Sequence, residues 1–300
     1  MEEYNITFLT DSRYVNPEVI NPYVQDILDE DNLVIQALRK KGINVNRVDW
    51  ADPVYEWATT KFAVFRTTWD YFDRYEEFIK WLNKVKDIVQ FINPIELILW
   101  NLDKHYLKDL SQKGINITET KFIETGEHIT LTNVLHEAGW KDAILKPAVS
   151  GSARHTYRIS EMNVAEHEDI FKELIAKESM LVQPFQKSVL KRGEISLIYF
   201  AGVYSHAIQK IAKVGDFRVQ SDFGGSVHNY SPTAKEIKLG EEAIQACSQI
   251  PVYGRVDVIE DNYGKSAVME LEIIEPELWF RFHPVSAQAM ANAIIDYIDL

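Results

Sequence analysis

The stretch of residues 254–275, GRVDVIEDNYGKSAVMELEIIE, decides the fold that we expect for this chain. It contains two short runs rich in strand-forming residues, at 254–259 and 266–274. Between them, the letters DNYG at 261–264 have the composition of a hairpin turn. The stretch therefore predicts an antiparallel β-hairpin.

Three acidic residues lie on this hairpin. Glu270 and Glu272 are two residues apart, so in a strand their carboxylates leave from the same face. Asp257 joins that face if it lies opposite Glu270 or Val268, whereas a slip of one residue sends it to the other side. Three carboxylates repel one another unless a cation lies among them, and an all-oxygen cluster favours a hard ion such as Mg²⁺. The alternative for this stretch alone is the polar outer face of an exposed hairpin.

The composition of the chain bounds its class. Its 300 residues, 46% hydrophobic and 12% aromatic, suit two or three packed units with a large core. The net charge of −13 argues against a nucleic-acid partner or an anionic membrane surface. The N-terminus does not resemble a signal peptide, and no apolar run approaches about 18 residues. We expect a cytoplasmic protein that has no membrane partner and could form a homo-oligomer.

The first hundred residues alternate between strand and helix patterns. Strands are predicted at 6–10, 43–48 and 62–65, and helices at 32–41 and 72–85. This alternation predicts an N-terminal α/β domain with a parallel sheet over residues 1–100, ended by the Asn-Pro pair at 93–94.

The segment after the third strand is a candidate substrate loop, because parallel sheets place ligands beyond the carboxyl ends of their strands. Its candidate residues are Arg66, Trp69, Asp70 and Tyr71. The alternative is a helix N-cap at Asp70 or a neighbouring aspartate, beside a packed tryptophan.

The remaining two thirds mix α and β patterns and predict two further units, at residues 101–185 and 186–300. Two helical pieces at 95–100 and 103–112 span the start of the first unit, which then contains strands at 120–123, 143–146 and 180–183, with helices at 131–138 and 164–177. The second contains strands at 194–200 and 203–211, a glycine-rich loop at 215–226, a helix at 233–248, the acidic hairpin and a last helix at 286–298.

Two strand ends could bind parts of a nucleotide. Lys146 ends an apolar strand, and the small residues after it (Ser150, Gly151 and Ser152 among them) could surround phosphate oxygens with backbone N–H groups. The segment is neither a Walker loop nor a dinucleotide fingerprint, and flexible surface loops look much the same.

Gln183, Pro184 and Phe185 end another strand, where backbone groups could bind an adenine edge and Glu194 could take ribose hydroxyls. The alternative is an ordinary strand pair with an exposed glutamate. Lys210 and Arg218 cluster with Lys213 around the glycine-rich loop, and Arg255 adjoins Asp257 on the acidic hairpin. Cations next to a cluster of carboxylates are what a metal-bound triphosphate requires, although Lys213 is interpreted as part of a solvated face.

In their order and spacing, these pieces resemble the ATP-grasp superfamily. The motifs that carry the resemblance are Asp103-Lys104, Lys146-Pro147, Gln183-Pro184-Phe185, Gly193-Glu194, Lys210, Arg218 before Gly224-Gly225, Arg255-Val256-Asp257 and Glu270-Leu271-Glu272. They cover roughly residues 100–300. The chain is most similar to the glutathione-synthetase-like branch that includes the O-ureido-serine cyclo-ligases of cycloserine biosynthesis, a likeness that reaches into the N-terminal third through WADP at 50–53 and RTTWDY at 66–71.

The resemblance implies a fold and a set of roles. The N-terminal domain would be followed by a two-lobed ATP-grasp fold with ATP between the lobes. The nucleotide would be held by Lys104, Lys146, Ser150, Gly151, Ser152, Gln183, Pro184, Phe185 and Glu194. Two Mg²⁺ ions, for which Mn²⁺ could substitute, would be bound by Asp257, Glu270 and Glu272. The reacting phosphates would face Lys210, Arg218 and Arg255, and the small substrate would meet Arg66, Trp69, Asp70, Tyr71, Gly224 and Gly225.

The function implied is an ADP-forming ligase that joins a carboxylate to an amine or similar nucleophile through an acyl phosphate. A small-molecule kinase and a non-catalytic ATP sensor are the alternatives. The intact set of lysines and carboxylates argues against a sensor. Many members carry Asn where this chain has Glu272, which can still bind Mg²⁺ with one more negative charge; the role of Glu275 is open.

Overall fold

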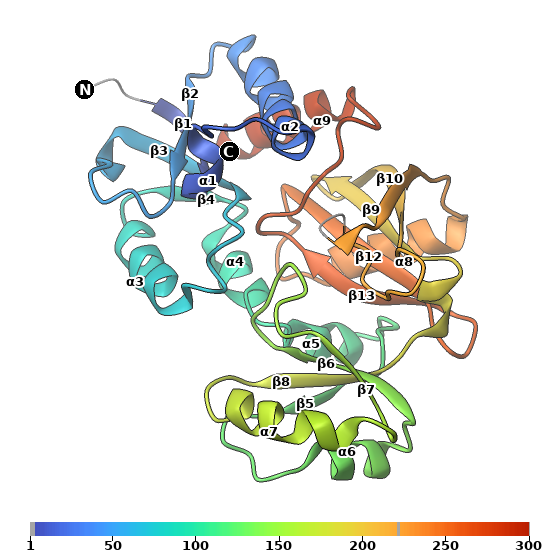
Figure 1. Cartoon of the computed structure of the whole chain (residues 1–300). Helices are drawn as coiled ribbons and strands as arrows, with labels where there is room; N and C mark the ends of the chain where they lie inside the picture. The colour runs from blue at the N-terminus through green and yellow to red at the C-terminus, as the bar shows by residue number, and fades with distance from the viewer. Residues whose placement is uncertain (1–3, 221–222, 300) are drawn as a thin grey trace.

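The computed structural model describes residues 4–220 and 223–299, which form three sheets (Figure 1). Each sheet lies within one of the three predicted units, whose boundaries remain predictions. Positions 221 and 222 of the predicted glycine-rich loop lie outside the described residues. No helix of the described part has the length and apolar character needed to cross a membrane.

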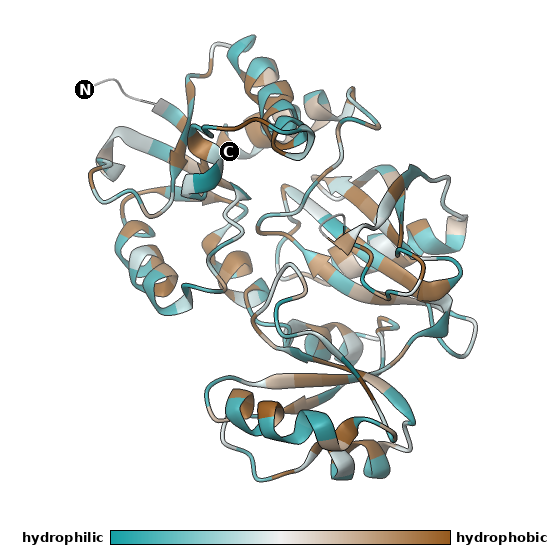
Figure 2. Ribbon diagram, viewed as in Figure 1, coloured by the Kyte–Doolittle hydropathy of each residue, from teal (hydrophilic) through white to brown (hydrophobic). Residues whose placement is uncertain are grey.

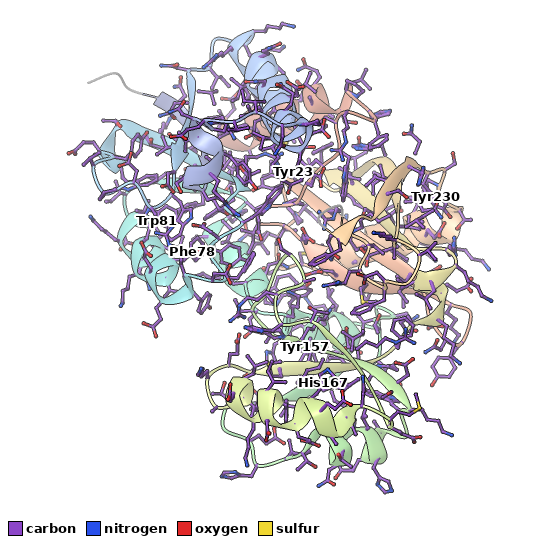
Figure 3. All side chains as sticks on the ribbon, viewed as in Figure 1. Tyr23, Phe78, Trp81, Tyr157, His167 and Tyr230 are labelled. Carbon is purple, nitrogen blue, oxygen red and sulfur yellow. The ribbon has the colours of Figure 1, made fainter. Side chains whose placement is uncertain are left out.

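The N-terminal sheet is parallel, with the strand order β2-β1-β3-β4. Its strands are β1 (Tyr4–Thr10), β2 (Val45–Asp49), β3 (Thr60–Thr67) and β4 (Gln90–Ile92). Side chains alternate between its faces, so Val64 packs toward helix α2 (Pro22–Arg39) while Phe65 packs toward α3 (Tyr75–Val85). Figure 3 shows Phe78 and Trp81 together on α3, within this second core.

Helix α2 begins ten residues before the predicted helix at 32–41, and this prediction of its start was wrong. Asn21 caps the helix by accepting a hydrogen bond from the Val24 N–H at 2.9 Å, and Pro22 occupies the first turn, where its missing N–H has no cost. The sequence pattern also gave no sign of the short helix α1 (Ser12–Val15).

The middle unit is an antiparallel sheet in the order β5-β8-β6-β7, with helices α6 (Leu131–Ala138) and α7 (Val164–Ile175) packed on it (Figure 1). Its strands are β5 (Lys121–Ile123), β6 (Asp142–Pro147), β7 (Tyr157–Ser160) and β8 (Met180–Pro184). Helices α4 (Ile95–Asn101) and α5 (Tyr106–Gln112) connect it to the N-terminal unit.

The C-terminal sheet is antiparallel, in the order β11-β10-β9-β12-β13, and helix α8 (Ala234–Gln245) packs on it. Its strands are β9 (Glu194–Phe200), β10 (Val203–Ile211), β11 (Ser226–Asn229), β12 (Tyr253–Glu260) and β13 (Ser266–Glu272). Figure 2 shows long hydrophobic stretches on these strands, as expected of a sheet with a covered face. Helix α9 (Ser286–Ile298) then returns to the N-terminal unit and lies against α2 (Figure 1).

Candidate functional site

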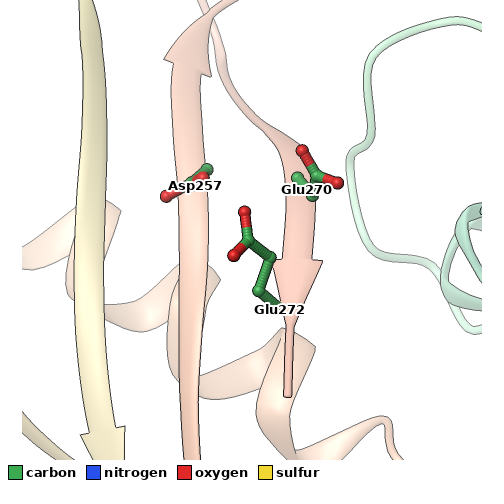
Figure 4. A group of neighbouring side chains, drawn as sticks. All are labelled: Asp257, Glu270 and Glu272. Carbon is green, nitrogen blue, oxygen red and sulfur yellow. The ribbon is translucent and has the colours of Figure 1, made fainter. Parts of the chain in front are cut away.

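The predicted hairpin is formed by β12 and β13, and Asp257 pairs with Glu270 across it. This register puts Asp257, Glu270 and Glu272 on one face, as one of the two registers considered from the sequence requires (Figure 4). Each of the three offers a carboxylate oxygen, and these oxygens lie within 4.8 Å of one another. An all-oxygen set at this spacing fits Mg²⁺ or Mn²⁺ in its donor chemistry.

Two cations, Arg255 and Lys210, lie among these carboxylates. Arg255 contacts Asp257, with Nε 2.9 Å from Oδ1, and also Glu272. Lys210 Nζ lies 3.1 Å from Asp257 Oδ2 and contacts Glu194, which begins β9. The five side chains therefore form one network of alternating charge beside the hairpin.

The network sets how readily each carboxylate ionises. Burial opposes the charge on Asp257, but Arg255 and Lys210 outweigh it and hold the pKa of Asp257 below its ordinary range. Burial raises the pKa of Glu272 to about 8, because Arg255 only partly offsets it. For Glu270, Lys104 and Lys146 overcome burial and lower the pKa. A proton is thus held more readily on Glu272 than on its two neighbours.

Lys104 and Lys146 approach the site from the middle unit. Lys104, just before α5, is buried and lies 3.1 Å from Glu270, and its ammonium also contacts the carbonyl of Ser150. Lys146 lies on β6, where burial lowers its pKa, and it forms no ion pair with any described residue. An ammonium that faces a cavity without a carboxylate partner is available to an anionic ligand.

The loop after β6 has an unusual backbone. Ser152 and Ala153 adopt φ values of 48° and 56°, in the left-handed region that non-glycine residues rarely occupy. At Gly151 an added Cβ would lie 2.5 Å from a ring carbon of Phe72, so a larger residue would displace that ring. This loop therefore packs directly against the N-terminal unit.

Gln183, Pro184 and Phe185 lie at the end of β8. Gln183 is buried, and its Nε2 donates to the Thr120 hydroxyl at 2.9 Å. The Phe185 ring lies between the guanidinium of Arg158, 3.7 Å from its centroid, and the edge of a second aromatic ring. These contacts fix the strand end, whose backbone faces the cavity described next.

A cavity of about 270 Å³ lies among the three units, close to the size range of small-ligand pockets. It brings together most of the residues predicted from the sequence. These are Trp69, Tyr71, Lys104, Lys146, Ser150, Gly151, Ser152, Gln183, Pro184, Phe185, Glu194, Lys210, Arg218, Arg255, Asp257, Glu270 and Glu272.

Arg66 and Asp70 are not brought to the cavity, which corrects our placement of both on the substrate side. Arg66 is only 1% exposed and is held by Glu30 at 2.7 Å and Asp31 at 2.8 Å. Asp70 accepts a hydrogen bond from the Trp50 indole at 2.7 Å and pairs with Arg74. Both side chains are therefore engaged in ion pairs with residues of the N-terminal unit.

Gly224 and Gly225 are not among the residues that line the cavity, and their predicted contact with the small substrate stays a prediction. A Cβ on Gly225 would lie 2.1 Å from the Val219 carbonyl oxygen, so this glycine permits close packing of the loop on itself. Arg218 does reach the cavity, with its guanidinium 2.7 Å from Asp216 and over the ring of Phe223.

The lining residues to which sequence reasoning gave no role include Tyr23, Glu277 and Trp279, and they also include Glu275, whose role it left open. The Trp279 ring lies 4.9 Å from the guanidinium carbon of Arg255 and 5.5 Å from Lys210 Nζ. Tyr23 is on the part of α2 that was not predicted to be helical. The run EPELWF at 275–280, charged and aromatic directly after β13, is the signal that could have identified Glu275, Glu277 and Trp279.

Known proteins are similar to this chain in sequence and in architecture. Residues 6–93 match the family described as D-cycloserine synthetase DcsG, N-terminal domain. The cycloserine biosynthesis protein DcsG of Streptomyces lavendulae is 28% identical over 283 residues, which cover 88% of this chain and 92% of that protein.

Two solved structures extend the likeness to the whole fold. The crystal structure of D-cycloserine synthetase DcsG has a TM-score of 0.86 and 25% identity, covering 97% of this chain and 99% of that one. The D-alanine–D-alanine ligase from Bacillus anthracis, crystallised with ATP, has a TM-score of 0.66 and 15% identity over 98% and 96% of the two chains. At that identity the second likeness shows the fold alone.

Proposed function

We propose a reaction on the premise that this chain belongs to the ATP-grasp superfamily and is one of its ligases. The predicted fold class, an N-terminal parallel-sheet domain followed by a two-lobed ATP-grasp fold, is confirmed. The proposed reaction is the ATP-dependent, ADP-forming joining of a carboxylate to an amine or related nucleophile on amino-acid-like small molecules. An acyl phosphate would be its intermediate.

One observation carries the proposal. The cavity collects Asp257, Glu270 and Glu272 together with five cations, Lys104, Lys146, Lys210, Arg218 and Arg255, from a chain whose net charge is −13. Carboxylates that can hold Mg²⁺, next to cations that can hold phosphate oxygens, are the parts that phosphoryl transfer needs.

The roles of the side chains follow from their positions. Lys146, which forms no ion pair within the described part of the chain, would bind phosphate oxygens together with Lys104 and the backbone after β6. The end of β8 would face the adenine, with Glu194 near the ribose. Asp257, Glu270 and Glu272 would hold Mg²⁺, which neutralises phosphate charge when it is bound.

Lys210, Arg218 and Arg255 would stabilise the negative charge that moves from ATP to the substrate carboxylate. All three are paired with carboxylates in this structure, so they would exchange part of those contacts for phosphate oxygens. The cavity is lined by all three units, so a closer approach of the units would exclude water from an acyl phosphate.

The test is nucleotide turnover with Mg²⁺ and ATP against amino acids and their pairs, with ADP, AMP and phosphate measured separately. We expect ADP and phosphate only when particular substrates are present. A stable phosphorylated product in place of free phosphate would indicate a kinase. Mg²⁺-dependent binding of a non-hydrolysable ATP analogue without turnover of any substrate would indicate a sensor.

A further inference from the structure

Glu275 differs from the other acidic residues of the cavity. Five of the six lining carboxylates pair with a cation: Glu194 with Lys210, Asp257 and Glu272 with Arg255, Glu270 with Lys104, and Glu277 with Arg281. Within residues 4–220 and 223–299, no cation forms an ion pair with Glu275, whose side chain is hydrogen-bonded to Tyr71. Glu275 thus presents to the cavity a carboxylate that forms no ion pair with any described residue.

An aromatic wall lies beside this carboxylate. The Trp69 indole N–H donates to the backbone carbonyl of Glu275 at 3.0 Å, which fixes the ring next to the residue. The rings of Trp69 and Tyr23 are tilted by 34° with centroids 6.5 Å apart, and both line the cavity. Figure 3 shows Tyr23 on the side of the N-terminal unit that faces the C-terminal lobe. Aromatic faces attract ammonium groups, most strongly where water is excluded.

We propose that Glu275, with the rings of Trp69 and Tyr23, binds the ammonium group of the small substrate and selects for substrates that carry one. This inference rests on the proposed ligase function and names the chemical class that the site would accept. Glu275 is then a specificity-determining residue. The ammonium would form the ion pair with Glu275 that no cation of residues 4–220 and 223–299 forms.

The surroundings of Glu275 support a binding role. Burial raises its pKa to about 7, because nearby Lys104 offsets only part of the cost of holding a charge there. An ammonium bound at this point would offset more of that cost, so the carboxylate and the ligand would stabilise each other's charged forms.

Hydrogen bonds with buried side chains of the N-terminal unit hold the backbone that follows Glu275. Arg66 donates to the carbonyl of Pro276 at 3.4 Å, and Glu30 accepts a hydrogen bond from the Leu278 N–H at 2.8 Å. Arg66 and Glu30 are themselves buried and paired at 2.7 Å. Arg66, predicted to touch substrate, instead holds the segment that would do so.

The experiment compares matched ligands on the protein saturated with Mg²⁺ and a non-hydrolysable ATP analogue. The probes are the D- and L-forms of alanine and serine, each measured by calorimetry against its counterpart without the amino group, propionate or 3-hydroxypropionate. We expect at least one amino acid to bind about tenfold or more tightly than its counterpart, as a charge-assisted hydrogen bond in a desolvated site gives.

Glu275→Gln should remove this preference, whereas Glu275→Asp should keep part of it. The control is Glu137→Gln on the exposed surface of α6, which should bind all probes as the wild type does. If no amino acid binds better than its counterpart, or if Glu275→Gln keeps the preference, the proposal is overturned.

Failure of the proposed function gives a different result. Without any Mg²⁺-dependent binding of the nucleotide analogue to the wild type, the ligase assignment itself fails. Substrate-dependent ADP release that uses amino and desamino compounds equally would leave the ligase intact and remove only the role of Glu275.

Discussion

The substitution Arg66→Met removes the cation from a buried network, and we expect it to destabilise the protein without acting directly on the substrate. Arg66 is only 1% exposed and bonds to Glu30 and Asp31 at 2.7 and 2.8 Å. Without it, Arg47 still lies 2.9 Å from Asp31, but Glu30 loses its cation. The consequence is an uncompensated carboxylate in the core.

The expected magnitude follows from this geometry. Removing one partner of a buried ion pair costs about 3–5 kcal/mol, and Met fills most of the volume, so the cavity contribution is small. Burial already raises the pKa of Glu30, and loss of Arg66 would raise it further. A carboxylate whose pKa is higher in the folded state stabilises that state below its unfolded pKa and loses the effect as pH rises. The deficit of Arg66→Met should therefore grow from about pH 5 to about pH 8.

The assay is urea denaturation at both pH values, followed by tryptophan fluorescence, because Trp50, Trp57 and Trp81 lie in the core of the N-terminal unit. The control is Arg74→Met, whose partly exposed ion pairs should contribute less than about 1 kcal/mol. Suppose that Arg66→Met unfolds at the urea concentration of the wild type and instead raises KM for the small substrate. The network argument would then be refuted, and the substrate role predicted from sequence would return.

Three further predictions concern the site. Asp257→Asn should abolish Mg²⁺-dependent ADP release in protein that is still folded at the assay temperature, although loss of the charge paired with Arg255 and Lys210 should lower the melting temperature; near-normal turnover would remove Asp257 from the proposed metal site. Trp69→Ala should raise KM for the small substrate and leave KM for ATP unchanged, and an effect on ATP alone would give Trp69 a packing role. Because the pKa of Glu275 is about 7, binding of an ammonium-bearing substrate should weaken from about pH 8 to about pH 6 as the carboxylate takes up a proton. The same titration of Glu275→Gln should be flatter, and an equally steep curve would assign the pH effect to another group.

The residues that local pattern could identify are those whose role depends on their own strand or loop. Glu270 and Glu272 share a face because strand side chains alternate, whatever the rest of the fold does. Lys146 and Gln183 were found because each stands at the end of an apolar strand, followed by small residues or proline. The family motifs then placed them in one site, as the cavity shows.

Tertiary structure decided everything that depends on which segments meet. From the sequence, Asp257 could lie opposite Glu270 or Val268 and share the face of Glu270 and Glu272, or it could point to the other face after a slip of one residue. Only the packed sheet selects Glu270 as its partner. Arg66 looked like a substrate ligand because it follows a parallel strand, yet α2 supplies Glu30 and Asp31 to bury it.

The proposed ammonium site at Glu275 also depends on which segments meet in the tertiary structure. Tyr23, Trp69 and Glu275 are distant in sequence and meet only because α9 and the segment before it return to the N-terminal unit. The periodicity of a sequence indicates only which way a side chain points from its own helix or strand. The charge or ring that it meets is fixed by burial of apolar faces between elements, and that is a property of the whole chain.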